Sequence, residues 1–136
     1  AGFAGVTAAS ADYFERAENL AGSFAAYAPG LPLLFWDVGL RPDQAAAARR
    51  WRGVEYRRLP LGDYPPHLAP MGWSECSYAF KPVVVRLALQ EFRCVLWLDS
   101  GLELRAPLDW APAWLEAAGA LLVASGWPFP NAWAHP

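Results

Sequence analysis

Residues 94–101, which read Cys-Val-Leu-Trp-Leu-Asp-Ser-Gly, decide how the rest of the chain is interpreted. The apolar run has about the length of one buried β-strand and is too short for an independent helix, and it stops at Asp99. In open α/β sheets, ligands bind outside the carboxyl ends of the strands, so a carboxylate in this position is placed where chemistry usually occurs. Asp and Ser also commonly cap turns after strands. The stretch alone therefore leaves Asp99 open as a site residue or a turn residue.

The composition indicates one folded domain and excludes several classes of protein. The chain has 136 residues, of which 55% are hydrophobic and 18% charged, which argues against disorder. The net charge is −2 and the basic residues are scattered, so nothing indicates a nucleic-acid partner. No apolar run of roughly 18 residues and no charged-then-apolar leader occurs, so we expect no membrane segment within these residues. The chain starts without Met and completes no element after Pro130, which suggests a piece of a longer protein.

The cysteines and histidines give no sign of a disulfide or a zinc site. Cys76 and Cys94 flank a predicted helix whose ends, at about 1.5 Å per residue, would be roughly 18 Å apart. A disulfide needs Cα atoms within about 7 Å, so no bridge is expected. His67 and His135 belong to no metal-ligand spacing, and each is expected to be a loop residue.

Residues 2–9 are predicted to form a first strand that leads into an amphipathic helix. Ser10 is the candidate N-cap, and apolar residues then recur on one helix face, namely Tyr13, Ala17, Leu20 and Phe24. Pro29 and Gly30 end this helix. The turn before it lacks the Gly-rich patterns of dinucleotide and P-loop sites, although the helix N-terminus could hold a phosphate or a sugar hydroxyl.

Two more strands are predicted, at residues 33–36 and 54–59, the second of them more exposed. The earlier strand ends at Asp37, which again places an acid at a strand end. The helix between them is expected to begin near Pro42, and Arg49 and Arg50 are expected to be dipole and solvent residues at its far end. Residues 60–73 contain four prolines and are expected to form a long loop without regular structure.

A third helix is expected to begin at or near Pro82. Its predicted core face comprises Val85, Ala88, Leu89 and Phe92, and the side predicted to face water comprises Arg86, Gln90 and Arg93. Lys81 lies at the helix entrance, where the dipole disfavours a cation, so its charge is better explained by a ligand.

After residue 101, a fourth helix is predicted with Asp109 as its cap, Pro112 in its first turn and Gly119 at its end. Residues 120–124 are predicted to form a last strand.

Strands that alternate with helices predict an α/β fold, a three-layer Rossmann-like arrangement with a mostly parallel sheet. The sequence does not fix the strand order. If the first three strands run outward in the order 3-2-1 and the fourth packs beside the first, the order reverses between residues 8–10 and residues 99–101. That switch point would be the ligand crevice.

Two motifs and one upstream stretch carry a resemblance to a known family. Residues 78–82 (YAFKP) and 95–101 (VLWLDSG), together with residues 37–40 (DVGL), resemble nucleotide-diphospho-sugar glycosyltransferases of the GT-A fold. They look most like a poorly characterised branch with an aromatic-x-x-K-P helix start and a W-[LM]-D-[SA] strand end. The resemblance implies that residues 1–136 are a single GT-A-type domain, the nucleotide-binding half of an enzyme. It also implies a nucleotide-diphosphate sugar as donor, and leaves the acceptor unidentified.

The resemblance also implies which positions form the site. The implied nucleotide-sugar-binding residues are Ala8, Ala9, Ser10, Asp37, Tyr78, Lys81, Asp99, Ser100 and Gly101. Asp99 matches the first Asp of the D-x-D motif, which in such enzymes binds a divalent metal, Mn or Mg, that bridges the diphosphate. Gly101 stands where the second Asp belongs. If the strand continues, only Glu103 could supply another carboxylate on the same face, and we expect it to be solvated.

Three functions remain open at this point. The first is a glycosyltransferase, and the second is a degenerate GT-A domain that binds a nucleotide sugar or a protein partner without turnover, suggested by Gly101. The third is an unrelated α/β enzyme such as a nucleotidyltransferase. The resemblance leaves the location open, the Golgi lumen for a eukaryotic member with an upstream anchor or the cytoplasm for a bacterial one.

Overall fold

The structure, a computed structural model, describes residues 2–69 and 78–120. The strands in these residues are β1 (Phe3–Ala9), β2 (Leu33–Asp37), β3 (Val54–Arg58) and β4 (Cys94–Trp97). The α-helices are α1 (Phe14–Tyr27), α2 (Pro42–Ala48), α3 (Phe80–Leu89) and α4 (Ala111–Ala118). Short 3-10 turns occur at η1 (Ala11–Tyr13), η2 (Leu61–Asp63) and η3 (Pro66–Leu68). Most of the predicted last strand, Cys76 and His135 lie outside the described residues.

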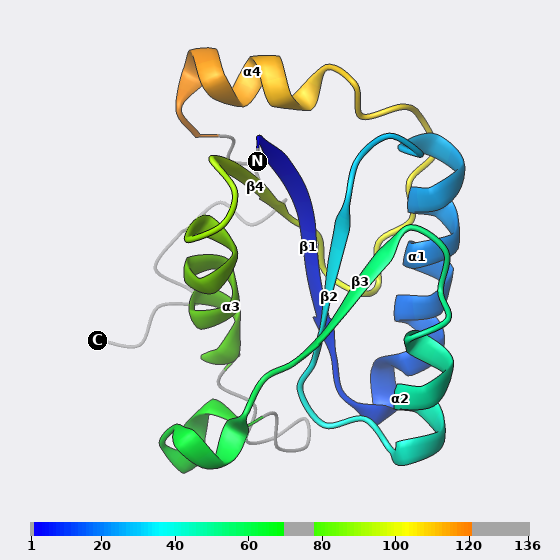
Figure 1. The fold of residues 1–136 in the computed structure, drawn as a ribbon, viewed down its shortest axis with the longest axis vertical. Helices are drawn as coiled ribbons and strands as arrows, with labels where there is room; N and C mark the ends of the chain where they lie inside the picture. The colour runs from blue at the N-terminus through cyan, green and yellow to red at the C-terminus, as the bar shows by residue number, and fades with distance from the viewer. Residues whose placement is uncertain (1, 70–77, 121–136) are drawn as a thin grey trace, which may run out of the picture.

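The strand order on which the predicted crevice depended, and which the sequence did not fix, is the one observed. The sheet has the order β3-β2-β1-β4, and every neighbouring pair is parallel. Helices α1 and α2 cover one face of the sheet and α3 covers the other, which gives the expected three layers (Figure 1). Helix α4 lies at the amino end of the sheet, where Ala111 and Leu115 pack against Phe3 (Figure 1). Helix α4 therefore does not cover the carboxyl ends of the strands, which lie at the opposite edge of the sheet. None of the helices in the described ranges is long and apolar enough to cross a membrane.

Strand β1 is the centre of the core, and all seven of its residues are buried. Its small side chains allow helices to approach from both faces. Gly5 is the closest approach, because a Cβ added there would lie 2.7 Å from Cε2 of the Phe24 ring on α1. The predicted face of α1 is confirmed for Ala17, Leu20 and Phe24, which are all buried.

The predicted core face of the third helix is wrong in part. The buried positions are Phe80, Val84 and Ala88, which lie four residues apart, while Leu89 is 50% exposed. The prediction is correct at Ala88 and Phe92, which are both buried. The helix also begins earlier than predicted, two residues before Pro82. A proline in the first helical turn is tolerated because the amide groups there have no intrahelical acceptor.

Several predicted helix and strand ends also need correction. Ser10 precedes η1 and its side chain makes no cap hydrogen bond, and the N-cap residue of α4 is Trp110 instead of Asp109. Gly119 ends α4 in the left-handed conformation, with φ 79°, as predicted. Within residues 60–69, the expected irregular loop contains η2 and η3. Strand β4 lies at the edge of the described sheet and its residues are only half-buried, so it is not a fully buried strand.

The contact between Gly5 and Phe24 predicts opposite effects for two glycine substitutions. Gly5→Ala should destabilise the protein by about 1–3 kcal/mol, since the added methyl group overpacks a tight contact. Gly22 lies on the exposed side of α1, and a Cβ added there would meet no atom within 4 Å. Gly22→Ala should therefore stabilise the protein by roughly 0.5–1 kcal/mol, because alanine has the higher helix propensity. Urea denaturation of both variants measures the difference. Equal stability of the two variants would contradict the close approach of α1 to β1.

Candidate functional site

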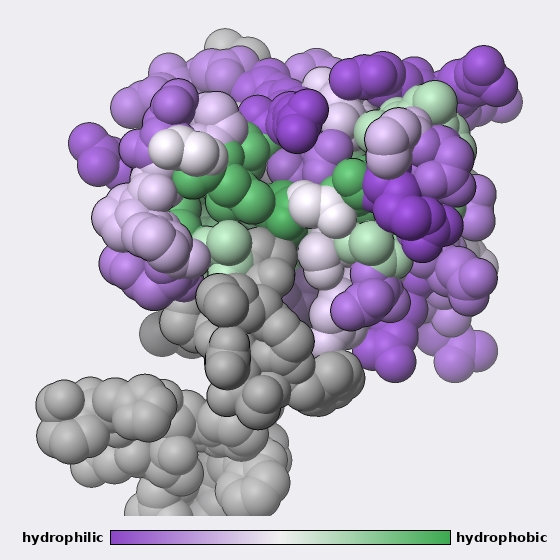
Figure 2. Space-filling view, turned by 90° about the horizontal axis from the view of Figure 1, so that it is seen from below, coloured by the Kyte–Doolittle hydropathy of each residue, from purple (hydrophilic) through white to green (hydrophobic). Residues whose placement is uncertain are grey.

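The predicted crevice is a cavity of about 320 Å³ at the carboxyl ends of β1 and β4. Its lining residues are Ala8, Ala9, Ser10, Tyr13, Arg16, Tyr78, Phe80, Lys81, Trp97, Asp99, Ser100 and Gly101. The structure thus brings together every residue predicted for the site except Asp37. Alanines of β1 and Phe80 give the cavity apolar walls, and Figure 2 shows apolar residues near the middle of this face with hydrophilic residues around them.

Asp99 reaches the cavity because β4 pairs in parallel with β1. Trp97 is level with Val6, and the Leu98 amide donates to the Val6 carbonyl at 2.8 Å. The chain then turns, with the Leu102 amide donating to the Asp99 carbonyl at 2.9 Å. Because the strand ends at Trp97, the alternation does not continue, and Glu103 is an exposed residue that does not line the cavity.

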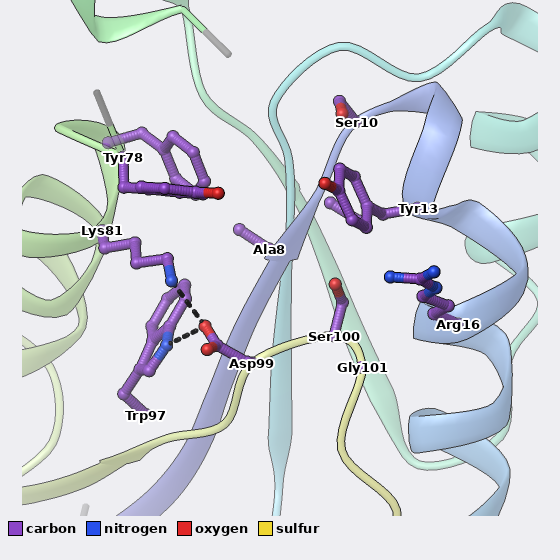
Figure 3. Close-up of a pocket in the computed structure, with 12 residues that line it drawn as sticks. Ala8, Ser10, Tyr13, Arg16, Tyr78, Lys81, Trp97, Asp99, Ser100 and Gly101 are labelled. Atoms are coloured by element: carbon purple, nitrogen blue, oxygen red, sulfur yellow. Dashed lines mark hydrogen bonds and ion pairs between the residues drawn. The ribbon is translucent and has the colours of Figure 1, made fainter. Parts of the chain in front are cut away.

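The Asp99 carboxylate holds a lysine. The Lys81 ammonium donates to Asp99 Oδ1 at 2.7 Å, and the indole Nε1 of Trp97 donates to the same oxygen at 2.8 Å (Figure 3). Partial burial alone would raise the pKa of Asp99, but the two hydrogen bonds and the Lys81 charge outweigh it and leave this pKa below its ordinary value. Asp99 is therefore an ionised acceptor that fixes the direction of the Lys81 side chain.

Aromatic rings flank Lys81. Its ammonium lies 4.7 Å from the centre of the Tyr78 ring and 5.7 Å from that of the Trp97 ring, both within the range of cation–π attraction. Tyr78 has φ 53°, which is uncommon for a residue with a bulky side chain. Such backbone conformations are found preferentially at binding sites, which is consistent with the place of Tyr78 in the cavity wall.

The opposite wall contains a second cation that the sequence analysis missed. Arg16 on α1 lies across the cavity from Lys81, and its guanidinium points toward the cavity (Figure 3). Its Cζ lies 5.4 Å from the centre of the Tyr13 ring. The sequence did contain a sign of it, because Tyr13 and Arg16 are three positions apart, a spacing that places two side chains on the same side of a helix. Trp97 was also missed as a site residue, because it belongs to the apolar run that was predicted to form a buried strand.

Asp37 does not line the cavity, because its carboxylate is used inside the fold. Oδ1 accepts from the amides of Gly39 and Leu40 at 2.9 and 2.7 Å, and Oδ2 accepts from the Tyr56 hydroxyl at 2.5 Å. Only 4% of Asp37 is exposed. Burial and the negative charge of Asp37 raise the pKa of Tyr56 to about 12. Arg49 is an exposed residue at the C-terminal end of α2, as expected, and its guanidinium also lies 4.5 Å from the centre of the Tyr56 ring.

The residues of the cavity do not form a good site for Mn or Mg. These ions prefer several oxygen ligands, usually including more than one carboxylate or the phosphates of a substrate. Asp99 is the only carboxylate among the lining residues, and one of its oxygens already accepts two hydrogen bonds. In the described residues, no three His, Cys, Asp or Glu side chains are grouped so as to hold a metal ion.

These features define a class of fold, a Rossmann-like α/β domain with a mostly parallel sheet and a cavity at the point where the strand order reverses. The chain shares this fold with the galactosyltransferase LgtC, whose crystal structure contains donor and acceptor sugar analogues. The TM-score is 0.52 with 23% identity, and the match covers 81% of this chain and 41% of that chain. No protein-family model matches the chain, and no curated protein matches its sequence.

The Tyr56–Asp37 hydrogen bond predicts a pH-dependent contribution to stability. Because the pKa of Tyr56 is raised from 10 to about 12, the folded state holds the phenol proton more tightly than the unfolded state. The contribution is complete below the unfolded value and is lost as the pH rises through the folded value. Tyr56→Phe should therefore lower Tm at neutral pH, and its difference from the parent should shrink at alkaline pH.

Thermal melts of the parent and Tyr56→Phe across this pH range measure the effect. Tyr27→Phe is the matched control, because Tyr27 is an exposed tyrosine on α1. A Tm difference between the parent and Tyr56→Phe that stays constant up to the pKa of Tyr56 would contradict the assignment.

Proposed function

We propose that this chain is the nucleotide-binding part of a glycosyltransferase that takes a sugar from a nucleotide-diphosphate donor. The observation that carries the proposal is the cavity at the switch point of a GT-A-like sheet, with Lys81 and Arg16 on opposite walls. The galactosyltransferase with the similar fold was crystallised with donor and acceptor sugar analogues, which supports the reaction class. The chain spans 41% of that enzyme's length, so the acceptor site of the proposed enzyme is expected to involve residues beyond this domain.

The lining residues match the parts of such a donor. A diphosphate carries negative charge that an ammonium and a guanidinium can hydrogen-bond, and a guanidinium can contact two phosphate oxygens at once. The rings of Tyr13 and Tyr78 offer flat surfaces for a base or a sugar ring. The hydroxyls of Ser10 and Ser100 can donate to or accept from ribose or sugar hydroxyls.

Catalysis by these residues would be mainly electrostatic. Cleavage of the bond between sugar and diphosphate leaves the extra negative charge on the diphosphate, and positive groups fixed in advance lower the energy of that state. Lys81 is fixed in this sense, because Asp99 and the Tyr78 and Trp97 rings hold its ammonium in one place. The acceptor and the base that activates it are not assigned.

A second candidate is a domain that binds a nucleotide sugar or a protein partner without turnover. Gly101 favours this second candidate, because glycine stands where the D-x-D motif has its second carboxylate. Hydrolysis or transfer of a bound donor separates the two candidates. Release of free sugar by the protein supports the transferase, and tight binding without any release supports the second candidate.

The binding part of the proposal is tested by calorimetry with UDP-glucose, UDP-galactose and GDP-mannose. We expect one donor to bind, and Lys81→Ala to weaken it by about tenfold or more, the effect of losing a charge-assisted hydrogen bond. Tm should change little, since Lys81 is partly exposed. Arg86→Ala is the matched control, because Arg86 is an exposed cation on α3 outside the cavity.

Two results would count against the proposal. If Lys81→Ala and Arg86→Ala bind the donor as tightly as the parent, the cavity is not the donor site. If none of the nucleotide sugars binds while nucleoside triphosphates do, the nucleotidyltransferase alternative is favoured.

A further inference from the structure

We infer that this site binds the diphosphate of its donor without a divalent metal, and that Lys81 and Arg16 supply the positive charge that a metal would bring. The inference rests on the proposed function and goes beyond it, because the D-x-D resemblance implies the opposite. Three observations support it.

The first observation is how Asp99 is used. In a metal site of this kind, the carboxylate at this position would face the ion. Here its Oδ1 accepts from both Lys81 and Trp97, at 2.7 and 2.8 Å. A cation placed against this carboxylate disfavours a divalent ion nearby, because the two positive charges would repel each other. Asp99 is therefore a positioning residue for Lys81.

The second observation is the charge of the cavity. Arg16, Lys81 and Asp99 are its only charged lining residues within the described ranges, so its walls carry one net positive charge. A site that binds a divalent ion through its own carboxylates is negative until the ion arrives. A positive cavity attracts a diphosphate by itself. The two cations lie on opposite walls, so both can reach one diphosphate placed between them (Figure 3).

The third observation is the space at Gly101. A Cβ added there would meet no atom within 4 Å, and the backbone is not in the left-handed region that favours glycine. The fold therefore does not require glycine at this position, and a second carboxylate would fit. The site therefore lacks a second carboxylate although the backbone would allow one, and the glycine leaves room for a ligand to approach the backbone.

The first experiment is calorimetry of the protein with UDP and with GDP, once in EDTA and once in excess MnCl₂. We expect one nucleoside diphosphate to bind with the same Kd in both buffers, within about threefold. In EDTA, Arg16→Gln should weaken binding by about tenfold, and Arg86→Gln, a matched exposed arginine outside the cavity, should not. Binding that requires manganese would overturn this inference and leave the proposed function intact. No binding of either nucleotide in either buffer would overturn both.

Two variants then separate a metal ligand from a positioning residue. Asp99→Asn keeps an oxygen acceptor for Lys81 and removes a negative charge, so UDP or GDP should bind in EDTA at least as tightly as to the parent. Gly101→Asp should weaken binding in EDTA by about tenfold and make manganese restore it, because it supplies the missing carboxylate. A loss of binding in Asp99→Asn that occurs in MnCl₂ but not in EDTA would show that Asp99 is a metal ligand and would contradict the inference. A Gly101→Asp variant indifferent to manganese would contradict it as well. Melting curves of Asp99→Asn and Gly101→Asp check that both variants are folded, as expected for substitutions in an exposed turn.

Discussion

The parallel pairing of β4 with β1 is the constraint on which the site depends. Four residues lie between the last paired position of β4, Trp97, and Leu102 in the following turn, and in that short segment the chain leaves the sheet. Because Trp97 is level with Val6 in the middle of β1, Asp99 is carried to the height of Ala8 at the carboxyl edge. Strand β2 lies on the other side of β1, so this edge is open where the strand order reverses.

Polar residues near the carboxyl edge of the sheet, from strand ends and helix starts, divide into two groups with different roles. Asp37 and Gln44 are buried, and their side chains hydrogen-bond loop backbone, Asp37 to Gly39 and Leu40, and Gln44 to Arg41 and Ala11. These bonds fix the loop after β2 against the loop after β1. Lys81 and Asp99 are partly exposed and bond each other at the cavity instead. The first group makes the edge rigid, and the second group presents charge on it.

The sequence predicted those features that follow from long-range periodicity and from strand ends. The alternation of strands and helices predicted the parallel sheet, and helical periodicity predicted the buried face of α1. The strand order had to be assumed, and with that order the meeting of residues 8–10 with residues 99–101 follows. The helix starts were less predictable, because Pro82 is acceptable at more than one position of a first turn, and α3 begins two residues before it.

The internal use of Asp37 could not be predicted from the sequence. Its partner Tyr56 is 19 residues away, and only the pairing of β2 with β3 brings the two together. Arg16 was missed for a related reason. On an amphipathic helix, a charged residue beside the core face is ordinarily solvated, and only the position of α1 relative to β4 places this one at the cavity.

The most direct test of the cavity as the nucleotide site uses the Trp97 indole, whose N–H donates to Asp99 at 2.8 Å. In ¹⁵N-labelled protein titrated with UDP or GDP, the indole resonance of Trp97, assigned by Trp97→Phe, should shift along a saturable curve. The indole of Trp110, exposed next to α4 at the other end of the sheet, should not move. Saturable binding that leaves the Trp97 resonance unchanged would contradict the account.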